Sequence, residues 1–169
     1  MSPSPIRVRA AIAGDGPAIA HAHGENAAYY AALAPDLFRV PDEDGLVEFV
    51  EPTPADNSER SLLIVAELEG EVVGHLFAEL FTPRDTDRFQ SPAEMSEVRL
   101  FIQALSVLQS HWRRGVASAL VEAAETWGRE RGATVVLCDT WPESPVSMPF
   151  WTDGMGYATR STRLRKRLE

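Results

Sequence analysis

The chain is poor in the residues that make cross-links and metal sites. It has one cysteine, Cys138, and four scattered histidines among 169 residues. An internal disulfide is therefore excluded, and the usual Cys and His spacing of a zinc site is missing. No apolar run approaches the roughly 20 residues of a membrane-spanning helix. These absences leave an apolar core as the source of stability, and we expect neither a metal nor a membrane partner.

What is present indicates an ordinary globular protein. Apolar residues make up 44% of the chain and charged residues 24%, and this length suffices to bury one substantial core. We expect a single domain over residues 1–169. The first five residues contain no apolar segment of the kind that signal peptides carry, so a cytoplasmic location is expected.

Charge is distributed unevenly along the chain. The net charge is −9, and residues 1–96 hold 17 acidic and 6 basic side chains against 8 and 10 in residues 97–169. A chain this acidic is a poor binder of nucleic acid. The asymmetry suits an anionic ligand in the second half and a cationic one near the first, where acids gather in residues 42–51. Acids that only keep the protein soluble explain it equally well.

The most informative stretch is VLQSHWRRGVAS, residues 107–118. An apolar run, residues 99–108, leads into it, and helical spacing follows it. In such a strand–turn–helix the first N–H groups of the helix lack acceptors, and the helix dipole adds roughly half a positive charge. Arg113 and Arg114 add two charges, and Gly115 permits close approach to the backbone. The stretch indicates a phosphate-binding turn, the alternative being an ordinary turn with exposed arginines.

This stretch resembles the pyrophosphate loop of the GNAT superfamily of N-acetyltransferases, whose pattern is Val-x-Pro-x-x-Arg/Gln-x-x-Gly-x-Gly/Ala. Gln109 stands in place of the Pro, and Trp112 in place of the first Arg or Gln. Because such loops hold phosphate mainly through backbone N–H groups, the resemblance implies that binding survives both changes. It implies acetyl-CoA as cosubstrate, without a metal. The cofactor-binding residues implied are Leu105, Val107, Arg113, Arg114, Gly115, Val116, Ala117 and Ser118.

Hydrophobic periodicity predicts the order of elements. Strands are expected at residues 6–10, 62–68, 72–81, 99–108, 133–141 and 157–168. Helices are expected at residues 15–33, with Asp15 as the cap, at 42–49 and 117–131, and as a short helix within 142–156. This order matches the GNAT fold, an α/β (α+β) class with a mixed, mostly antiparallel central sheet flanked by helices. The resemblance implies a central β-α-β unit that holds the cofactor.

A second segment resembles the family motif Asn-x-x-Ala-x-x-Phe-Tyr-x-x-x-Gly-Phe. The matching positions are Ser144, Ser147, Phe150, Trp151 and residues 156–157, with one extra residue before the glycine. In the family the Asn helps to hold the pantetheine, and the Tyr is often the acid that protonates the thiolate. The resemblance implies Ser144 and Trp151 as cofactor contacts. It supplies no general acid, because an indole does not usefully protonate sulfur.

The general base is the least defined group. The family often has Glu four residues before the last Val of the cofactor strand, where this chain has Gln103. Glu97 shares the face of Gln103 by alternation but lies further back. Asp139 lies near the carboxyl end of the strand expected at residues 133–141. We consider both carboxylates as bases, and Asp139 also as a group that holds a cationic acceptor or merely caps the strand end.

The expected activity is direct transfer of an acetyl group from acetyl-CoA to a primary amine. The alternative is a non-catalytic acyl-CoA-binding or regulatory protein on the same fold, which Gln103 and Trp151 favour. A third hypothesis is a site for another phosphorylated ligand. Small polyamines, aminoglycosides, amino acids and protein N-termini stay open as acceptors, and the acidic first half favours a small cationic amine. Many relatives are dimers, so a homodimer is also considered.

Overall fold

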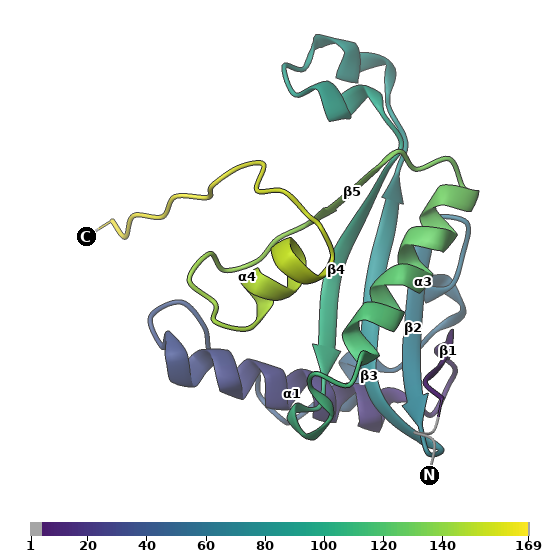
Figure 1. Ribbon diagram of the computed structural model, residues 1–169, viewed down its shortest axis with the longest axis vertical. Helices are drawn as coiled ribbons and strands as arrows, with labels where there is room; N and C mark the ends of the chain where they lie inside the picture. The colour runs from purple at the N-terminus through teal and green to yellow at the C-terminus, as the bar shows by residue number, and fades with distance from the viewer. Residues whose placement is uncertain (1–4, 169) are drawn as a thin grey trace. The chain divides into compact units, whose positions relative to one another are not determined.

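The computed structural model describes residues 5–168 (Figure 1). The chain divides into two compact units, Met1–Cys138 and Asp139–Glu169. The first unit contains the whole sheet and three helices, and the second contains a short helix that runs into a π-helical turn. The expectation of one domain over residues 1–169 stays a prediction.

The first unit is built on one five-stranded sheet in the order β1-β2-β3-β4-β5. Its first four strands pair as antiparallel neighbours, and β5 runs parallel to β4. The strands are β1 (Arg7–Ala10), β2 (Ser61–Leu68), β3 (Glu71–Phe81), β4 (Arg99–Val107) and β5 (Val135–Cys138). The predicted mixed, mostly antiparallel sheet is confirmed.

Helices cover both faces of this sheet. They are α1 (Gly16–Leu33), the short α2 (Leu46–Val50) and α3 (Val116–Glu130). The ring of His23 in α1 lies against that of His75 in β3, whereas Gly128 in α3 lies against Leu100 in β4. Leu100 pairs with Leu80 of β3, five residues from His75. Because side chains alternate along a strand, α1 and α3 occupy opposite faces.

Local turn chemistry explains where the elements of the sheet end. Glu69 and Gly70 form a two-residue turn between β2 and β3, with φ values of 57° and 87°. Left-handed values at both positions are typical of a tight hairpin turn. Gly132, with φ of 84°, follows α3, as expected of a glycine that ends a helix. β4, α3 and the parallel β5 therefore form the predicted β-α-β unit.

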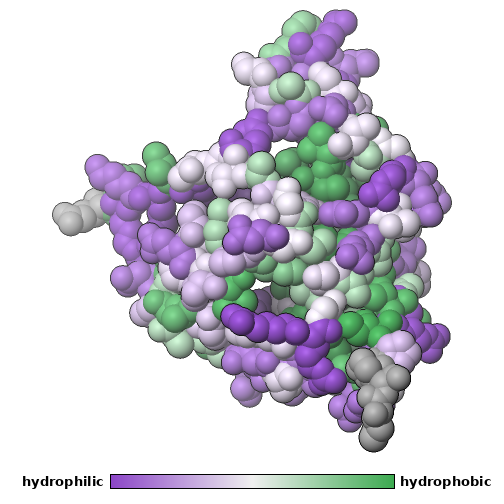
Figure 2. Space-filling model, viewed as in Figure 1, coloured by the Kyte–Doolittle hydropathy of each residue, from purple (hydrophilic) through white to green (hydrophobic). Residues whose placement is uncertain are grey.

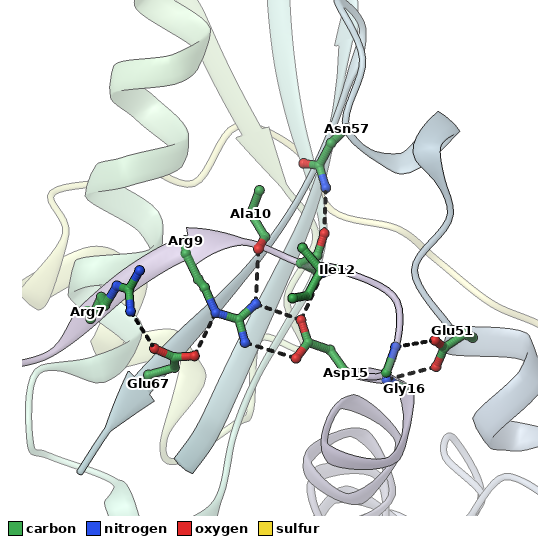
Figure 3. Close-up of polar contacts among 11 residues, drawn as sticks. Arg7, Arg9, Ala10, Ile12, Asp15, Gly16, Glu51, Asn57 and Glu67 are labelled. Carbon is green, nitrogen blue, oxygen red and sulfur yellow. Dashed lines mark hydrogen bonds and ion pairs between the residues drawn. The ribbon is translucent and has the colours of Figure 1, made fainter. Parts of the chain in front are cut away.

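An ion-pair network fastens the start of α1 to the sheet edge (Figure 3). Arg9 of β1 lies 2.6 Å from Glu67 and 2.7 Å from Asp15. Its guanidinium holds the pKa of Asp15 below the usual value for a carboxyl. Asp15 occupies the cap position but makes no side-chain capping bond; instead Glu51 accepts the N–H of Gly16 at 3.0 Å. The predicted capping role of the Asp15 side chain is therefore wrong.

The predicted sixth strand, residues 157–168, is also wrong. This segment has no regular secondary structure, and Leu164 and Leu168 are 90% and 87% exposed. Figure 2 shows mainly hydrophilic residues along it. It carries five cationic side chains, so pairing it with a strand would crowd like charges and bury little apolar surface.

Two other elements differ from their predicted bounds, and a third lies within them. The strand expected at 133–141 is the four-residue β5. The helix expected at 42–49 begins only after Gly45, whose φ is 78°, and Phe49 is 84% exposed rather than packed. The short helix in the second unit is α4 (Ser147–Pro149), followed by a π-helical turn over Phe150–Gly154. Because short elements contain few periodic positions, their bounds depend on tertiary contacts.

Residues 5–168 lack two features, a membrane-spanning helix and a cluster of metal-ligating side chains. No helix in this part of the chain is long and apolar enough to cross a membrane. Within the same residues no group of three or more histidine, cysteine, aspartate or glutamate side chains is arranged to hold a metal ion.

Candidate functional site

The two halves of β4 have different neighbours. Arg99 to Ile102 pair with β3 on one side and with β5 on the other, and the last pair with β5 joins Ile102 to Cys138. β5 ends there, whereas β4 continues to Val107 with β3 as its one partner. Residues 103–107 therefore form an open edge, defined here as the part of β4 that extends beyond β5.

The backbone groups that face outward from this edge follow from strand alternation. Leu108 donates its N–H to the carbonyl of Val73 at 2.9 Å and so faces β3. Leu105 and Val107 must then face away from β3. The carbonyl of Val107 accepts the indole N–H of Trp112 at 2.8 Å. The outward groups that remain are the N–H of Val107 and both backbone groups of Leu105, and they suit the amides of an extended ligand.

A β-bulge lies where the open edge begins. The register of β3 against β4 shifts between Phe77 and Ala78, which leaves Gln103 as an extra residue in β4. Such a bulge bends a strand and interrupts its pairing, which explains why β5 separates from β4 here. The side-chain amide of Gln103 donates to the carboxylate of Glu79 in β3. A carboxylate is thus present at the start of the open edge, although Gln103 itself is neutral.

The turn at residues 108–115 leads into a helix start whose first N–H groups lack an intrahelical acceptor. Gly115 has a φ of 84°, and Arg113, two residues earlier, has a φ of 59°. The first hydrogen bond of α3 joins the N–H of Ala119 to the carbonyl of Gly115 at 3.0 Å, and no side chain caps the helix. A left-handed residue before helical ones points successive N–H groups into one concavity, which is a recurrent anion site. The helical N–H groups without an intrahelical acceptor are those of Val116, Ala117 and Ser118.

Positive charge surrounds this turn. Arg113 and Arg114 are exposed, and neither makes an ion pair with any of the residues described. The positive end of the α3 dipole lies at the same place. A side chain added at Gly115 would meet only Ile6, at 3.7 Å, so the backbone is open there. The N–H groups, the arginines and the bare glycine together fit a pyrophosphate group.

A neutral histidine lies behind the open edge. His75 of β3 pairs directly with Ser106 of β4. The His75 side chain is 4% exposed, and its Nδ1 has no hydrogen-bond partner among the described residues. Burial, with a smaller contribution from His23, lowers the pKa of His75 to about 4. His75 is therefore uncharged at neutral pH and is a weak base.

Ser144 and Trp151, the cofactor contacts suggested by the second motif, belong to the second unit. The hydroxyl oxygen of Ser144 accepts the N–H of Ser147 at 3.0 Å. Trp151 is 6% exposed and packs between Phe150 and Tyr157, with ring centroids 5.0 and 4.9 Å away. Both side chains thus have roles inside their own unit, and their contact with a cofactor stays a prediction.

Asp139 and Glu97, the two predicted bases, have partners elsewhere. Asp139 directly follows β5, and its exposed carboxylate accepts a hydrogen bond from Arg163 at 3.0 Å. Glu97 precedes β4, at the end away from the open edge, and accepts the hydroxyl of Thr134 at 2.6 Å. Their catalytic roles stay predictions, and the position of Glu97 favours a structural contact.

Sequence reasoning missed Glu79 and the contact made by Trp112. Glu79 lies 24 residues from Gln103, and the register that joins them includes the bulge. Alternation along β3 places Glu79 on the same face as His75, but no local pattern shows which residue of β4 it meets. Trp112 looked like a lost phosphate contact, because a sequence does not show that an indole turns back to the strand before it.

An open strand edge that leads into an uncapped helix start, within a mixed sheet, is the arrangement expected of an acyltransferase. The chain belongs to the Acetyltransferase (GNAT) family, whose model matches residues 27–157. It is an acyltransferase by that membership, which confirms the predicted family, whereas the role of residues 107–118 as its pyrophosphate loop stays a prediction.

Individual relatives agree with this assignment. Aminoglycoside N(6')-acetyltransferase type 1 of Salmonella typhimurium strain LT2 is 30% identical over 107 residues, which cover 63% of this chain and 68% of that protein. AAC(6')-Iy, in complex with the bisubstrate analog CoA-S-monomethyl-acetylneamine, has 20% identity and a TM-score of 0.61 over 98% of this chain and 100% of that one. A transcriptional regulator from Bacillus halodurans C-125 has 20% identity and a TM-score of 0.71 over 97% and 100%. The two structures support the fold alone.

Proposed function

We propose that this protein is an N-acetyltransferase that moves an acetyl group from acetyl-CoA directly to a primary amine. The observation that carries the proposal is the continuity of two features. The open edge, residues 103–107, leads directly into the turn at residues 108–115, whose two arginines have no ion-pair partner among the described residues, and then into the uncapped start of α3. Bound there, acetyl-CoA supplies an activated thioester, and the protein supplies position and charge.

The residues of the site divide into two binding roles. The N–H groups of residues 116–118, with Arg113 and Arg114, bind the pyrophosphate. The outward backbone groups of Leu105 and Val107 bind the amides of the pantetheine and orient the thioester. An outward N–H on this edge also stabilises negative charge on the thioester oxygen during attack, which is a large term in acyl transfer.

We propose Glu79 as the group that accepts a proton from the ammonium of the acceptor, directly or through water, so that the neutral amine attacks the thioester. The position of the Glu79 carboxylate supports this role, because it lies at the start of the open edge, where β4 and β5 separate. Asp139, which directly follows β5, is the alternative base. Glu79→Gln should lower kcat/KM by 10²-fold or more and leave the Kd of acetyl-CoA unchanged. Glu71→Gln, at the exposed start of the same strand, is the matched control.

We further propose a small cationic amine as acceptor. The acids of residues 42–51 and the excess of acids in residues 1–96 favour such a partner. The Salmonella relative is named as an aminoglycoside N-acetyltransferase, so aminoglycosides belong in the first panel beside polyamines and amino acids. An amine without a second positive charge is expected to react more slowly. A cytoplasmic location and a homodimer complete the proposal.

The first experiment is thermal unfolding with acetyl-CoA, free CoA and ATP. A ligand that binds the folded state alone stabilises it by about 2.7 kcal/mol at a hundredfold excess over Kd. A higher midpoint with both CoA compounds but not ATP supports the cofactor assignment and leads to an amine panel monitored by thiol release. Equal shifts with ATP would favour a site for another phosphorylated ligand, and no shift at all would contradict the proposal.

The second candidate is a non-catalytic acyl-CoA-binding or regulatory protein. Two observations favour it, because Gln103 cannot accept a proton and the buried Trp151 provides no acid. It predicts binding of acetyl-CoA without thiol release for any amine in the panel. Steady turnover with one amine would exclude it.

A further inference from the structure

Helix α1 contacts the turn at residues 108–115 through two side chains that are four residues apart in the helix. The carboxylate of Glu25 accepts the backbone N–H of Gln109 at 2.7 Å, and the Gln109 amide approaches the Glu25 carbonyl at 3.4 Å. Four residues later, the ring of Tyr29 meets Trp112 edge to face, with centroids 4.9 Å apart and planes at 88°. Residues four apart lie on one face of a helix, so the same face of α1 makes both contacts.

Trp112 joins this helix to the end of β4. Its indole N–H donates to the carbonyl of Val107 at 2.8 Å while its ring rests against Tyr29. The Trp112 side chain therefore connects three parts of the molecule, namely the turn, the end of β4 and helix α1. Gln109 and Trp112 are also the two positions at which the loop departs from the family pattern. Both departures face α1 rather than the phosphate.

The backbone conformation of Arg113, the residue after Trp112, depends on its surroundings. Arg113 has a φ of 59°, which is unfavourable for any residue but glycine. Such a conformation persists where its surroundings determine it. The N–H groups that follow it converge only while the turn keeps this shape. A turn that is already in its binding shape loses less conformational freedom when the ligand arrives.

We propose that Trp112 is a positioning residue for acetyl-CoA, which holds residues 108–115 in their anion-binding shape by bonding Val107 and packing on Tyr29. It acts through the turn and does not touch the reacting atoms. The inference rests on the proposed function, because it assumes that acetyl-CoA is the anion bound. It predicts an effect on cofactor affinity with little effect on turnover.

The test replaces Trp112 with phenylalanine, which keeps an aromatic ring against Tyr29 and removes the N–H donor. The Kd of acetyl-CoA, measured by calorimetry, and its KM should each rise about fivefold, the effect typical of one lost hydrogen bond. kcat and the KM of the amine should stay within about twofold. Trp127→Phe is the matched control, since Trp127 lies in α3 against Arg131, with the guanidinium 4.3 Å from its ring centre. This control should leave the Kd unchanged.

Different results separate the two proposals. Absence of acetyl-CoA binding by the unmodified protein overturns both. Binding by the unmodified protein with an unchanged or lower Kd for Trp112→Phe overturns the positioning role alone, as does an equal rise for Trp127→Phe. If Trp112→Phe does not fold, Tyr29→Leu removes the ring on which Trp112 packs and leaves its N–H bond to Val107 in place. A two- to threefold rise in Kd is then expected, and an unchanged Kd would overturn the proposal.

Discussion

The two ends of the β4–α3–β5 unit use the same backbone device for different purposes. At the closed end, residues 99–102 with 128–132, Gly132 has a φ of 84° and the N–H of Ala133 returns to the carbonyl of Gly128 at 2.9 Å. At the open end, residues 103–118, Gly115 has the same φ but no comparable bond closes the helix start. Left-handed glycine completes the fold at one end and leaves N–H groups for a ligand at the other.

The strand beneath the helix differs in the same way. At the closed end both edges of β4 are paired, and Gly128 brings α3 against Leu100. At the open end the strand has lost one partner, carries a bulge at Gln103 and pairs with His75, whose Nδ1 has no hydrogen-bond partner among the described residues. β4 therefore has a strand partner on both edges at the closed end and on one edge at the open end, as expected where an extended ligand pairs with the free edge.

Exchange of the two glycines for glutamate gives the largest contrast. Gly115→Glu should raise the Kd of acetyl-CoA at least about 100-fold, because it adds a negative charge where the pyrophosphate binds. Gly132→Glu should leave the Kd unchanged. Both variants should lose about 1–2 kcal/mol of unfolding free energy, since both place a side chain at positive φ. Calorimetric titration and urea denaturation measure the two effects separately.

Equal changes in the Kd of acetyl-CoA for Gly115→Glu and Gly132→Glu would contradict this prediction. In that case the loss would reflect strain in α3 rather than the position of the charge. Gly115→Ala separates the factors further, because it has the strain without the charge and should bind several times more tightly than Gly115→Glu.

Acid should lower the free energy of unfolding through protonation of His75, which lies at the open end. The folded-state pKa of His75 is about 4, against about 6.5 for an unperturbed histidine. The unfolded state therefore binds the proton first, and stability is lost as the pH falls from about 6.5 to 4. The loss attributable to His75 is about 3 kcal/mol at full protonation. Urea denaturation at pH 7, 5.5 and 4.5 measures it.

His75→Phe is the variant that tests this assignment. It should reduce the loss of stability over this pH range, because phenylalanine does not titrate. His21→Phe, on the exposed side of α1, is the control and should keep the full dependence. An equal slope in all three proteins would assign the acid sensitivity to other groups.

The same contrast explains what the sequence could predict. The turn and α3 were predicted closely, because their signals are local: helical spacing, a glycine at each end and two adjacent arginines. The hairpin at Glu69 and Gly70 is equally local. The glycine turn of the closed end could thus be predicted from the chain itself, and so could the turn and helix start of the open end.

The rest of the open end depends on partners distant in sequence. Gln109 meets Glu25 across 84 residues, and Gln103 meets Glu79 across a bulged register. The length of β5 depends on where β4 bends, and no pattern in β5 itself contains that information. The absent strand at 157–168 shows the same limit, since alternation alone predicted pairing that a charged segment does not make.

Two other glycines mark close approaches, one at each end. A methyl group on Gly74 of β3 would lie 2.8 Å from the carbonyl oxygen of Ser106, whereas one on Gly128 would lie 3.0 Å from a terminal carbon of Leu100. Backbone yields less readily than the end of a side chain. Gly74→Ala should therefore lose about 1–3 kcal/mol. Gly128→Ala should change stability by less, because alanine gains about 1 kcal/mol of helix propensity.

Denaturant midpoints of these two variants compare the ends directly. Gly74→Ala should also raise the Kd of acetyl-CoA, because Gly74 pairs with Val107 and a shift there moves the outward N–H. A greater loss of stability in Gly128→Ala than in Gly74→Ala would show that the closed end is the more tightly packed one.

The smallest contrast concerns the arginines. Arg113→Ala and Arg114→Ala should each weaken acetyl-CoA binding about three- to fivefold at low salt, and less at 0.5 M salt, because exposed charges are screened. Arg131→Ala should leave binding unchanged. It should lose roughly 0.5–1 kcal/mol of stability, since Arg131 lies over the ring of Trp127 and donates to its carbonyl at 3.3 Å. Titrations at two salt concentrations test whether positive charge acts at the open end alone, and equal salt dependence in all three variants would contradict that division.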